Sequence, residues 1–207
     1  MKKQNIPEEI IALITEEEIN IFQELQIQIK ELNNKTNLTR LINGDDYWIS
    51  QVFDSIWPFK AFPNINFNNK KFLDIGSGCG FPGLAYAITH PTSEIYLVDS
   101  SKKKTDALKA LIKEINFKNN IHVIYDRIEN LAHQSSMRNS FHIATTRAVS
   151  NPSTVSEYIL PMLKKEGLGV LYCGKWTDKE SKNLNKTLEI LKGKFKEKKK
   201  ISLPRSK

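Results

Sequence analysis

The stretch KFLDIGSGCGFPG, residues 71–83, decides how this chain of 207 residues folds. An apolar segment typical of a buried strand, KFLDI, runs directly into a segment with four glycines, at positions 76, 78, 80 and 83. Glycine in the interior of a helix or strand is destabilising by about 0.5–1 kcal/mol relative to alanine. The cluster therefore predicts a sharp strand-to-helix turn whose backbone adopts unusual angles or approaches a ligand closely.

Downstream of this turn, short apolar segments alternate with helical ones. Strands that alternate with helices predict a parallel sheet covered on both faces, which is an α/β doubly wound fold. The expected strands after 71–75 are 94–100, 121–126, 141–147 and 167–174, and the expected helices are 83–90, 102–116 and 154–166.

Upstream of residue 71 the pattern is helical. Apolar residues recur every three or four positions over 8–32, which predicts one or two amphipathic helices, and 47–59 reads as another helix. The segment 61–70 has a proline and a polar cluster. We therefore expect a small helical N-terminal region, 1–65, followed by the α/β domain, 66–207.

A strand, a glycine-rich turn and a helix start together favour a nucleotide-type cofactor site contacted by Gly76, Gly78 and Gly80. Asp99 ends the second expected strand, 23 residues after Gly76, close to the offset of an acid that binds ribose hydroxyls. The alternative is that the glycines form only a tight turn and that Asp99 caps the next helix.

Pro82 bears on which cofactor this is. A dinucleotide needs backbone N–H groups at the helix N-terminus for its pyrophosphate, and proline removes one of them. S-adenosylmethionine has no phosphate, so the spacing and the proline favour this methyl donor.

Charge and composition limit the other partners. The net charge is +8, which suggests a polyanionic partner such as nucleic acid or a membrane surface, although a solvated basic surface is the alternative. Two cysteines, no signal peptide and no long apolar run indicate a cytoplasmic protein without a disulfide framework or membrane span. The four histidines lack metal-ligand spacing, and we expect no metal site.

Several motifs resemble one family. LDIGSGCGFPG, LVDSSKKKTDAL, DRIEN and TRA, with NKTNLTRL and DSIWP upstream, are similar to the bacterial 16S rRNA (guanine-N7) methyltransferase family RsmG, also called GidB, from about residue 20 to about residue 176. The resemblance implies a class I, Rossmann-like methyltransferase that uses S-adenosylmethionine to methylate N7 of a guanine in 16S rRNA of the small ribosomal subunit. The most serious departure from the family pattern is that the apolar final strand usual in the family is missing here, which suggests a chain shortened at its C-terminus.

The resemblance further implies site residues. The basic residue Arg147 is expected to act at the catalytic site and on the donor. The other implied donor contacts are Gly76, Phe81, Ile128 and Glu129, with Asp99, Ser100 and Ser101 at the ribose. Asn37, Thr39 and Arg40 are expected to face the RNA. Lys175, just after the fifth expected strand, is a further candidate for RNA phosphate.

The chemistry needs no dedicated general base. Guanine N7 carries an in-plane lone pair and no hydrogen, so rate enhancement can come from positioning it in line with the methyl group. We expect a monomer that acts on 16S rRNA or the small subunit. Two alternatives remain open: a methyltransferase for small molecules, and a non-catalytic RNA-binding or assembly factor that retains a donor pocket.

Overall fold

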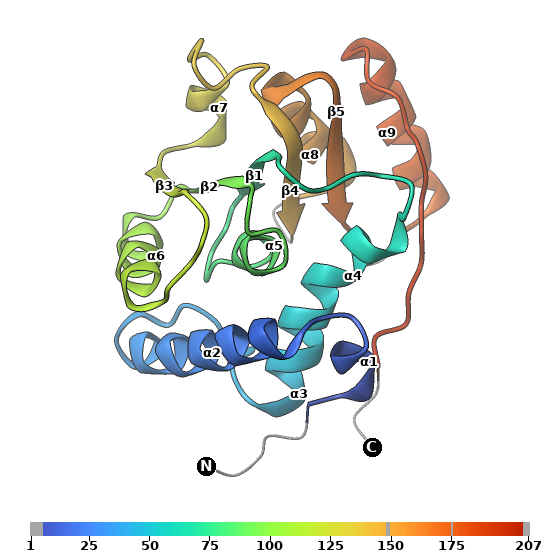
Figure 1. The fold of residues 1–207 in the computed structure, drawn as a ribbon. Coiled ribbons are helices and arrows are strands. Elements are labelled where there is room, and N and C mark those ends of the chain that lie inside the picture. The colour runs from blue at the N-terminus through green and yellow to red at the C-terminus, as the bar shows by residue number, and fades with distance from the viewer. Residues whose placement is uncertain (1–5, 148–149, 175, 205–207) are drawn as a thin grey trace.

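Five parallel strands form the centre of the molecule (Figure 1). The computed structural model describes residues 6–147, 150–174 and 176–204. The strand order is β3-β2-β1-β4-β5, which confirms the expected α/β doubly wound sheet. The strands are β1 Lys71–Ile75, β2 Glu94–Asp99, β3 Ile121–Tyr125, β4 Phe141–Arg147 and β5 Leu163–Tyr172.

The two faces of the sheet bury different clusters. Side chains alternate along a strand, so Phe72 of β1 packs into one hydrophobic cluster while Leu73 and Ile75 pack into the other. Helices α5 Gly83–Thr89 and α6 Lys102–Glu114 cover the first face. Helix α7 Ile128–Leu131 and helix α8 Pro152–Ile159, which runs into the 3₁₀ turn η2 Leu160–Met162, cover the second, and α9 Asp178–Ile190 packs on α8.

The N-terminal region adds a helical layer outside α5 and α6 (Figure 1). It consists of α1 Glu8–Ile11, α2 Glu16–Thr36, α3 Gly44–Tyr47, the π-helix η1 Trp48–Phe53 and α4 Asp54–Ala61. Its buried residues, such as Phe22 and Trp48, belong to the same cluster as Phe72 and Leu84. The helical region and the sheet therefore share one continuous core.

One expectation about local structure is wrong, and one helix was not predicted. Residues 163–166 were expected to be helical, but they begin β5, where Leu163 pairs with Phe141 of β4. This long-range pairing outweighs the local preference. Helix α9 was not expected, although Thr177 and Glu180 form a capping box at its start, a signal that the sequence does contain.

The remaining C-terminal segment has no regular structure, since 194–204 form neither helix nor strand in the part of the chain that the structure describes. It runs back along α9 toward the N-terminal helices (Figure 1). Among the described residues, every helix is too short or too polar to cross a bilayer.

Candidate functional site

The sheet has a topological switch point between β1 and β4. The chain proceeds outward through β2 and β3 on one side of β1 and through β5 on the other side of β4. Ile75 and Thr146 are register partners at the carboxyl ends of these two strands. Ligands of open α/β sheets bind in the crevice outside such a point. The glycine loop, residues 76–82, and Arg147 flank it.

The three glycines of the loop have different reasons to be glycine. All three have positive φ, at 73° for Gly76, 57° for Gly78 and 100° for Gly80. A Cβ on Gly78 would meet nothing nearer than the Gly76 carbonyl oxygen, at 3.8 Å, whereas a Cβ on Gly80 would lie 2.4 Å from Leu84 Cδ1. Gly78 is therefore open to a ligand, whereas a side chain at Gly80 is opposed both by its φ and by the contact with Leu84.

Asp99 braces the loop. Its Oδ2 accepts a hydrogen bond of 2.9 Å from the backbone N–H of Gly78, and its Oδ1 accepts one of 2.8 Å from that of Ser101. Asp99 thus contacts the residue before α6, but Ser101 and not Asp99 is the N-cap of that helix. A carboxylate has about four lone-pair sites, so the capacity to accept ribose hydroxyls remains.

A second acid, which the sequence analysis did not single out, lies behind the loop. Asp74 is fully buried and accepts hydrogen bonds from Gly83 N (2.9 Å) and Thr145 Oγ1 (3.1 Å). Burial raises the pKa of Asp74 to about 6, although these hydrogen bonds favour the ionised form. It joins the end of β1 to the start of α5 and to β4.

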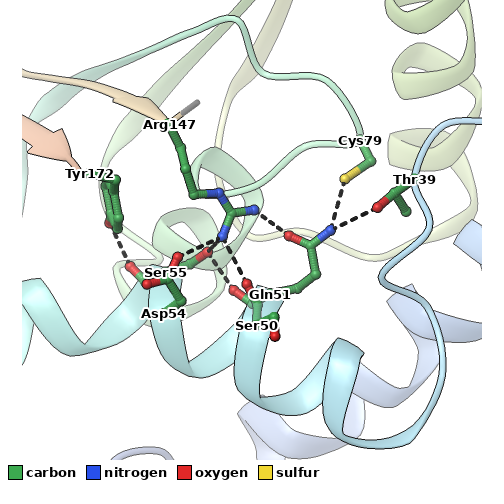
Figure 2. A network of polar contacts seen from close by, with 8 residues as sticks. All are labelled: Thr39, Ser50, Gln51, Asp54, Ser55, Cys79, Arg147 and Tyr172. Carbon is green, nitrogen blue, oxygen red and sulfur yellow. Dashed lines mark hydrogen bonds and ion pairs between the residues drawn. The ribbon is translucent and has the colours of Figure 1, made fainter. Parts of the chain in front are cut away.

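Arg147 points away from the sheet into the N-terminal helices (Figure 2). Its Nη1 donates to the Ser50 carbonyl (3.1 Å), to Asp54 Oδ2 (3.1 Å) and to Ser55 Oγ (3.3 Å). Its Nη2 donates to Gln51 Oε1. The guanidinium is therefore held at the edge of the crevice by one short segment, 50–55.

The negative partner of Arg147 is itself half-buried. Burial raises the pKa of Asp54, while the charge and hydrogen bond of Arg147 act in the opposite direction. Tyr172, at the end of β5, donates to the Ser55 carbonyl at 2.8 Å, and burial together with the nearby Asp54 charge raises its phenol pKa. The phenol is thus a neutral donor, and it ties β5 to the same segment.

Gln51 is a central residue that the sequence analysis missed. Its amide is 2% exposed, and Nε2 donates to Thr39 Oγ1 (3.1 Å) and Cys79 Sγ (3.3 Å) while Oε1 accepts from Arg147 (Figure 2). The amide therefore joins three segments: the turn after α2, the glycine loop and the end of β4. No local pattern marks this role, because all three partners are distant in the sequence.

The other expected site residues vary in placement. Phe81 is buried and packs edge-on against Tyr47, with ring centroids 5.9 Å apart. Ile128 is buried, whereas Ser100 is exposed and Glu129 pairs with Arg127 at the surface (2.9 Å). The structure brings the glycine loop and Asp99 together, but their binding roles stay predictions.

The expected RNA contacts lie on the turn after α2. Asn37 ends α2 with a φ of 48°, and both Asn37 and Arg40 are exposed. The Thr39 hydroxyl accepts from Leu41 N (3.1 Å) and from Gln51, which links this turn to the crevice. Lys175 lies outside the described residues.

Thr146 is a further missed candidate. It is buried at the end of β4, and its Oγ1 has no hydrogen-bond partner among the residues that the structure describes. Buried polar atoms are usually satisfied, so an orphaned hydroxyl beside a crevice suggests a ligand contact.

No three or more His, Cys, Asp or Glu side chains lie close enough together to bind a metal ion within residues 6–147, 150–174 and 176–204.

The strand order, the glycine turn after β1 and the acid at the end of β2 define a protein with the class I S-adenosylmethionine-dependent methyltransferase fold. Solved structures agree on this fold. A putative S-adenosyl-L-methionine-dependent methyltransferase from Methanococcus maripaludis matches with a TM-score of 0.50 and 17% identity over 77% of this chain and 70% of its own. An O-methyltransferase from Thermotoga maritima matches with a TM-score of 0.51 and 12% identity over 79% of this chain and 55% of its own.

The chain belongs to the rRNA small subunit methyltransferase G family, whose model matches residues 18–206. A ribosomal RNA small subunit methyltransferase G from Prochlorococcus marinus (strain MIT 9312) is 88% identical over all of this chain and 87% of its own length. One from Parasynechococcus marenigrum (strain WH8102) is 38% identical over 87% of this chain and 73% of its own length. The family membership that the motifs predicted is confirmed.

Proposed function

We propose that this chain transfers a methyl group from S-adenosylmethionine to N7 of a guanine in the 16S rRNA of the small ribosomal subunit. The observation that carries the proposal is the switch point between β1 and β4, where the open Cβ position of Gly78 lies beside Asp99 in a member of an rRNA methyltransferase family. The proposal has the chain act as a monomer, in the cytoplasm, where its rRNA substrate is.

The residues around the crevice fit the methyl donor. Gly76 and Gly78 present backbone without side chains, Asp99 retains lone pairs for ribose hydroxyls, and the Thr146 hydroxyl is buried without a partner in the described residues. We assign the donor to this set, with Ser100, Ser101, Ile128 and Glu129 at its margins. When bound, S-adenosylmethionine supplies a methyl group attached to a positively charged sulfur.

The chain has to position the acceptor rather than activate it. Because guanine N7 has a lone pair and no hydrogen, no side chain need remove a proton first. Arg147 is a cationic group beside the switch point, and its guanidinium is held by four acceptors from 50–55. We assign it the role of orienting the reactants, through the donor carboxylate, the base edge or an RNA phosphate.

The RNA is proposed to approach over the turn after α2. Asn37 and Arg40 are exposed there, and Thr39 connects the turn to Gln51. The net charge of +8 favours a phosphate backbone as the partner, and a splayed, single-stranded guanine is the form in which such a base becomes accessible.

Methyl transfer to isolated subunits tests the function. Small subunits from cells that lack the modification are incubated with the chain and labelled S-adenosylmethionine, and 7-methylguanine is mapped by primer extension after chemical cleavage at the modified base. We expect label in 16S rRNA at one guanine with the wild type and with the surface variant Asp106→Asn, and a strong reduction with Arg147→Ala. Donor binding without any transfer to rRNA would instead support a non-catalytic role.

A further inference from the structure

The buried amide of Gln51 bridges two segments at the carboxyl edge of the sheet, which form the walls of the proposed donor site. One wall is the glycine loop, which it contacts at Cys79 Sγ (3.3 Å), and the other is the end of β4, which it contacts at the Arg147 guanidinium. We propose that Gln51 is a positioning residue for methyl transfer, whose amide holds these two walls at a fixed separation and couples them to the turn that carries Thr39. The inference rests on the proposed function.

The orientation of the amide is determined by its surroundings. Oε1 can accept from Arg147, whereas Nε2 can only donate, and its partners are Thr39 Oγ1 and Cys79 Sγ. A flipped amide would direct its two N–H groups at a cationic guanidinium. The amide is also 2% exposed, so water cannot replace either contact freely. Gln51 is thus locked in one orientation.

The π-helix η1 brings the acceptors of Arg147 to one side. Ser50 and Gln51 lie within η1, and Asp54 and Ser55 lie in the first turn of α4 that follows it. The Ser55 hydroxyl donates to the Gln51 carbonyl at 2.5 Å across this junction. π-helical turns are uncommon and often occur at functional sites. The wide turn lets four groups, from residues 50, 51, 54 and 55, converge on one guanidinium (Figure 2).

The same amide reaches the proposed RNA side. Thr39 lies between the exposed residues Asn37 and Arg40, and its hydroxyl accepts from Gln51 Nε2. A displacement of that turn by bound RNA would therefore be transmitted through the Gln51 side chain to Arg147 and to the glycine loop. Gln51 would align the methyl donor with the base that the turn presents.

Gln51→Met tests this role, because methionine keeps the length of the side chain and removes both hydrogen-bonding groups. Gln26→Met is the matched control: Gln26 is another buried glutamine of the helical region, 1% exposed, whose Nε2 donates to the Ile42 carbonyl at 2.9 Å and to none of the partners of Gln51. Calorimetry with S-adenosylhomocysteine measures donor-site affinity, and single-turnover methyl transfer to small subunits measures the rate. We expect Gln51→Met to reduce both by about tenfold, and Gln26→Met to change neither more than about twofold.

Two further variants separate positioning from mere support of the fold. Gln51→Glu keeps an acceptor for Arg147, and the Thr39 hydroxyl and Cys79 thiol can turn to donate to it, so this variant is expected to restore affinity and rate to within about threefold of wild type. Thr39→Val leaves Gln51 in place but removes one partner of its amide, and we expect it to lower the rate of methyl transfer about threefold. This variant still tests the network if Gln51→Met does not fold.

A double-mutant cycle with Arg147→Lys decides whether Gln51 acts through Arg147. We expect Gln51→Met to have less than about a twofold effect in the Arg147→Lys background, since residues in one network are not additive. An equal loss in both backgrounds, or an equal loss in Gln26→Met, overturns the positioning role alone. If the wild type fails to bind S-adenosylhomocysteine, the proposed function fails together with this inference. If it binds but does not methylate rRNA, only the function fails, and the affinity cycle still decides the role of Gln51.

Discussion

The backbone amide of Gly83 donates a hydrogen bond of 2.9 Å to the carboxylate of Asp74, which ties the first turn of α5 to the end of β1 beneath the glycine loop. A Cβ on Gly83 would lie 2.9 Å from the same Asp74 oxygen and 2.2 Å from Leu97 Cδ2. The fourth glycine of the motif is therefore required by this close approach, and a fully buried acid supports the loop that faces the proposed ligand.

Asp74 should make stability depend on pH. Its pKa is raised from 3.8 to about 6 by burial, so the folded state binds this proton more tightly than the unfolded chain does. The contribution of Asp74 to the free energy of unfolding therefore decreases by about 3 kcal/mol as pH rises from about 4 to about 6. We expect Asp74→Asn, which can accept from Gly83 and donate to Thr145, to remove this decrease in urea unfolding at pH 4 and pH 7.5. Asp106→Asn, at the surface, serves as the control and should keep the wild-type profile.

His90 should make the free energy of unfolding depend on pH in the opposite direction. Burial lowers the pKa of His90 from 6.5 to about 4, and its ring stacks on Tyr86 with centroids 4.2 Å apart. The stability from this group is complete above pH 6.5 and is lost, by about 3 kcal/mol, as pH falls toward 4. We expect His90→Phe to lose less stability than the wild type between pH 6.5 and pH 4, as measured by urea unfolding. A variant that loses as much stability in acid as the exposed-site control His133→Asn would contradict this expectation.

The glycines of the loop should separate binding from folding. A Cβ at Gly78 has space, so we expect Gly78→Val to fold with a loss of about 1–2 kcal/mol from the positive φ and to lose donor affinity, because the side chain occupies ligand space. Gly80→Ala should instead lower the free energy of unfolding by about 3 kcal/mol or more through the clash with Leu84. Thermal unfolding and calorimetry with S-adenosylhomocysteine measure the two effects. Full donor affinity in Gly78→Val would place the ligand elsewhere.

Thr146→Val should raise the stability of the fold and lower the affinity for the methyl donor. Valine has the shape of threonine without the hydroxyl, whose oxygen has no partner in the described residues. We expect the free energy of unfolding to rise by about 1 kcal/mol and the affinity for S-adenosylhomocysteine to fall by about fivefold. Ser156→Ala offers a comparison, since the Ser156 hydroxyl is satisfied by the Pro152 carbonyl at 2.8 Å and its removal should only destabilise. Unchanged affinity in Thr146→Val would remove this hydroxyl from the site.

The salt dependence of binding should differ between the rRNA and the methyl donor. Binding to RNA through phosphate contacts weakens steeply with ionic strength, whereas the donor site makes few such contacts. Between 50 and 200 mM salt we expect the affinity for small-subunit rRNA to fall about twentyfold for roughly three phosphate contacts, and the affinity for S-adenosylhomocysteine to change little. Filter binding and calorimetry provide the measurements, and Arg40→Gln should reduce the salt slope. Activity that survives high salt unchanged would favour a small-molecule substrate.

Local patterns predicted much of the fold because they report local backbone preferences. The alternation of strands and helices identified the parallel sheet, and Asp99 was placed beside the glycine loop by spacing alone. The start of β5 was misread because the pairing of Leu163 with Phe141 depends on a neighbouring strand. Helix α9 was missed although Thr177 and Glu180 signal its beginning.

By itself, the sequence determined the sheet, the glycine turn and the family, since these depend on side-chain periodicity and on motifs within a few residues of one another. Only the tertiary structure decided what surrounds Arg147: Gln51 lies 96 residues away along the chain, yet its amide contacts the guanidinium. Such contacts arise when separate elements pack on one core, and the free energy that selects them belongs to the packed arrangement rather than to either segment alone.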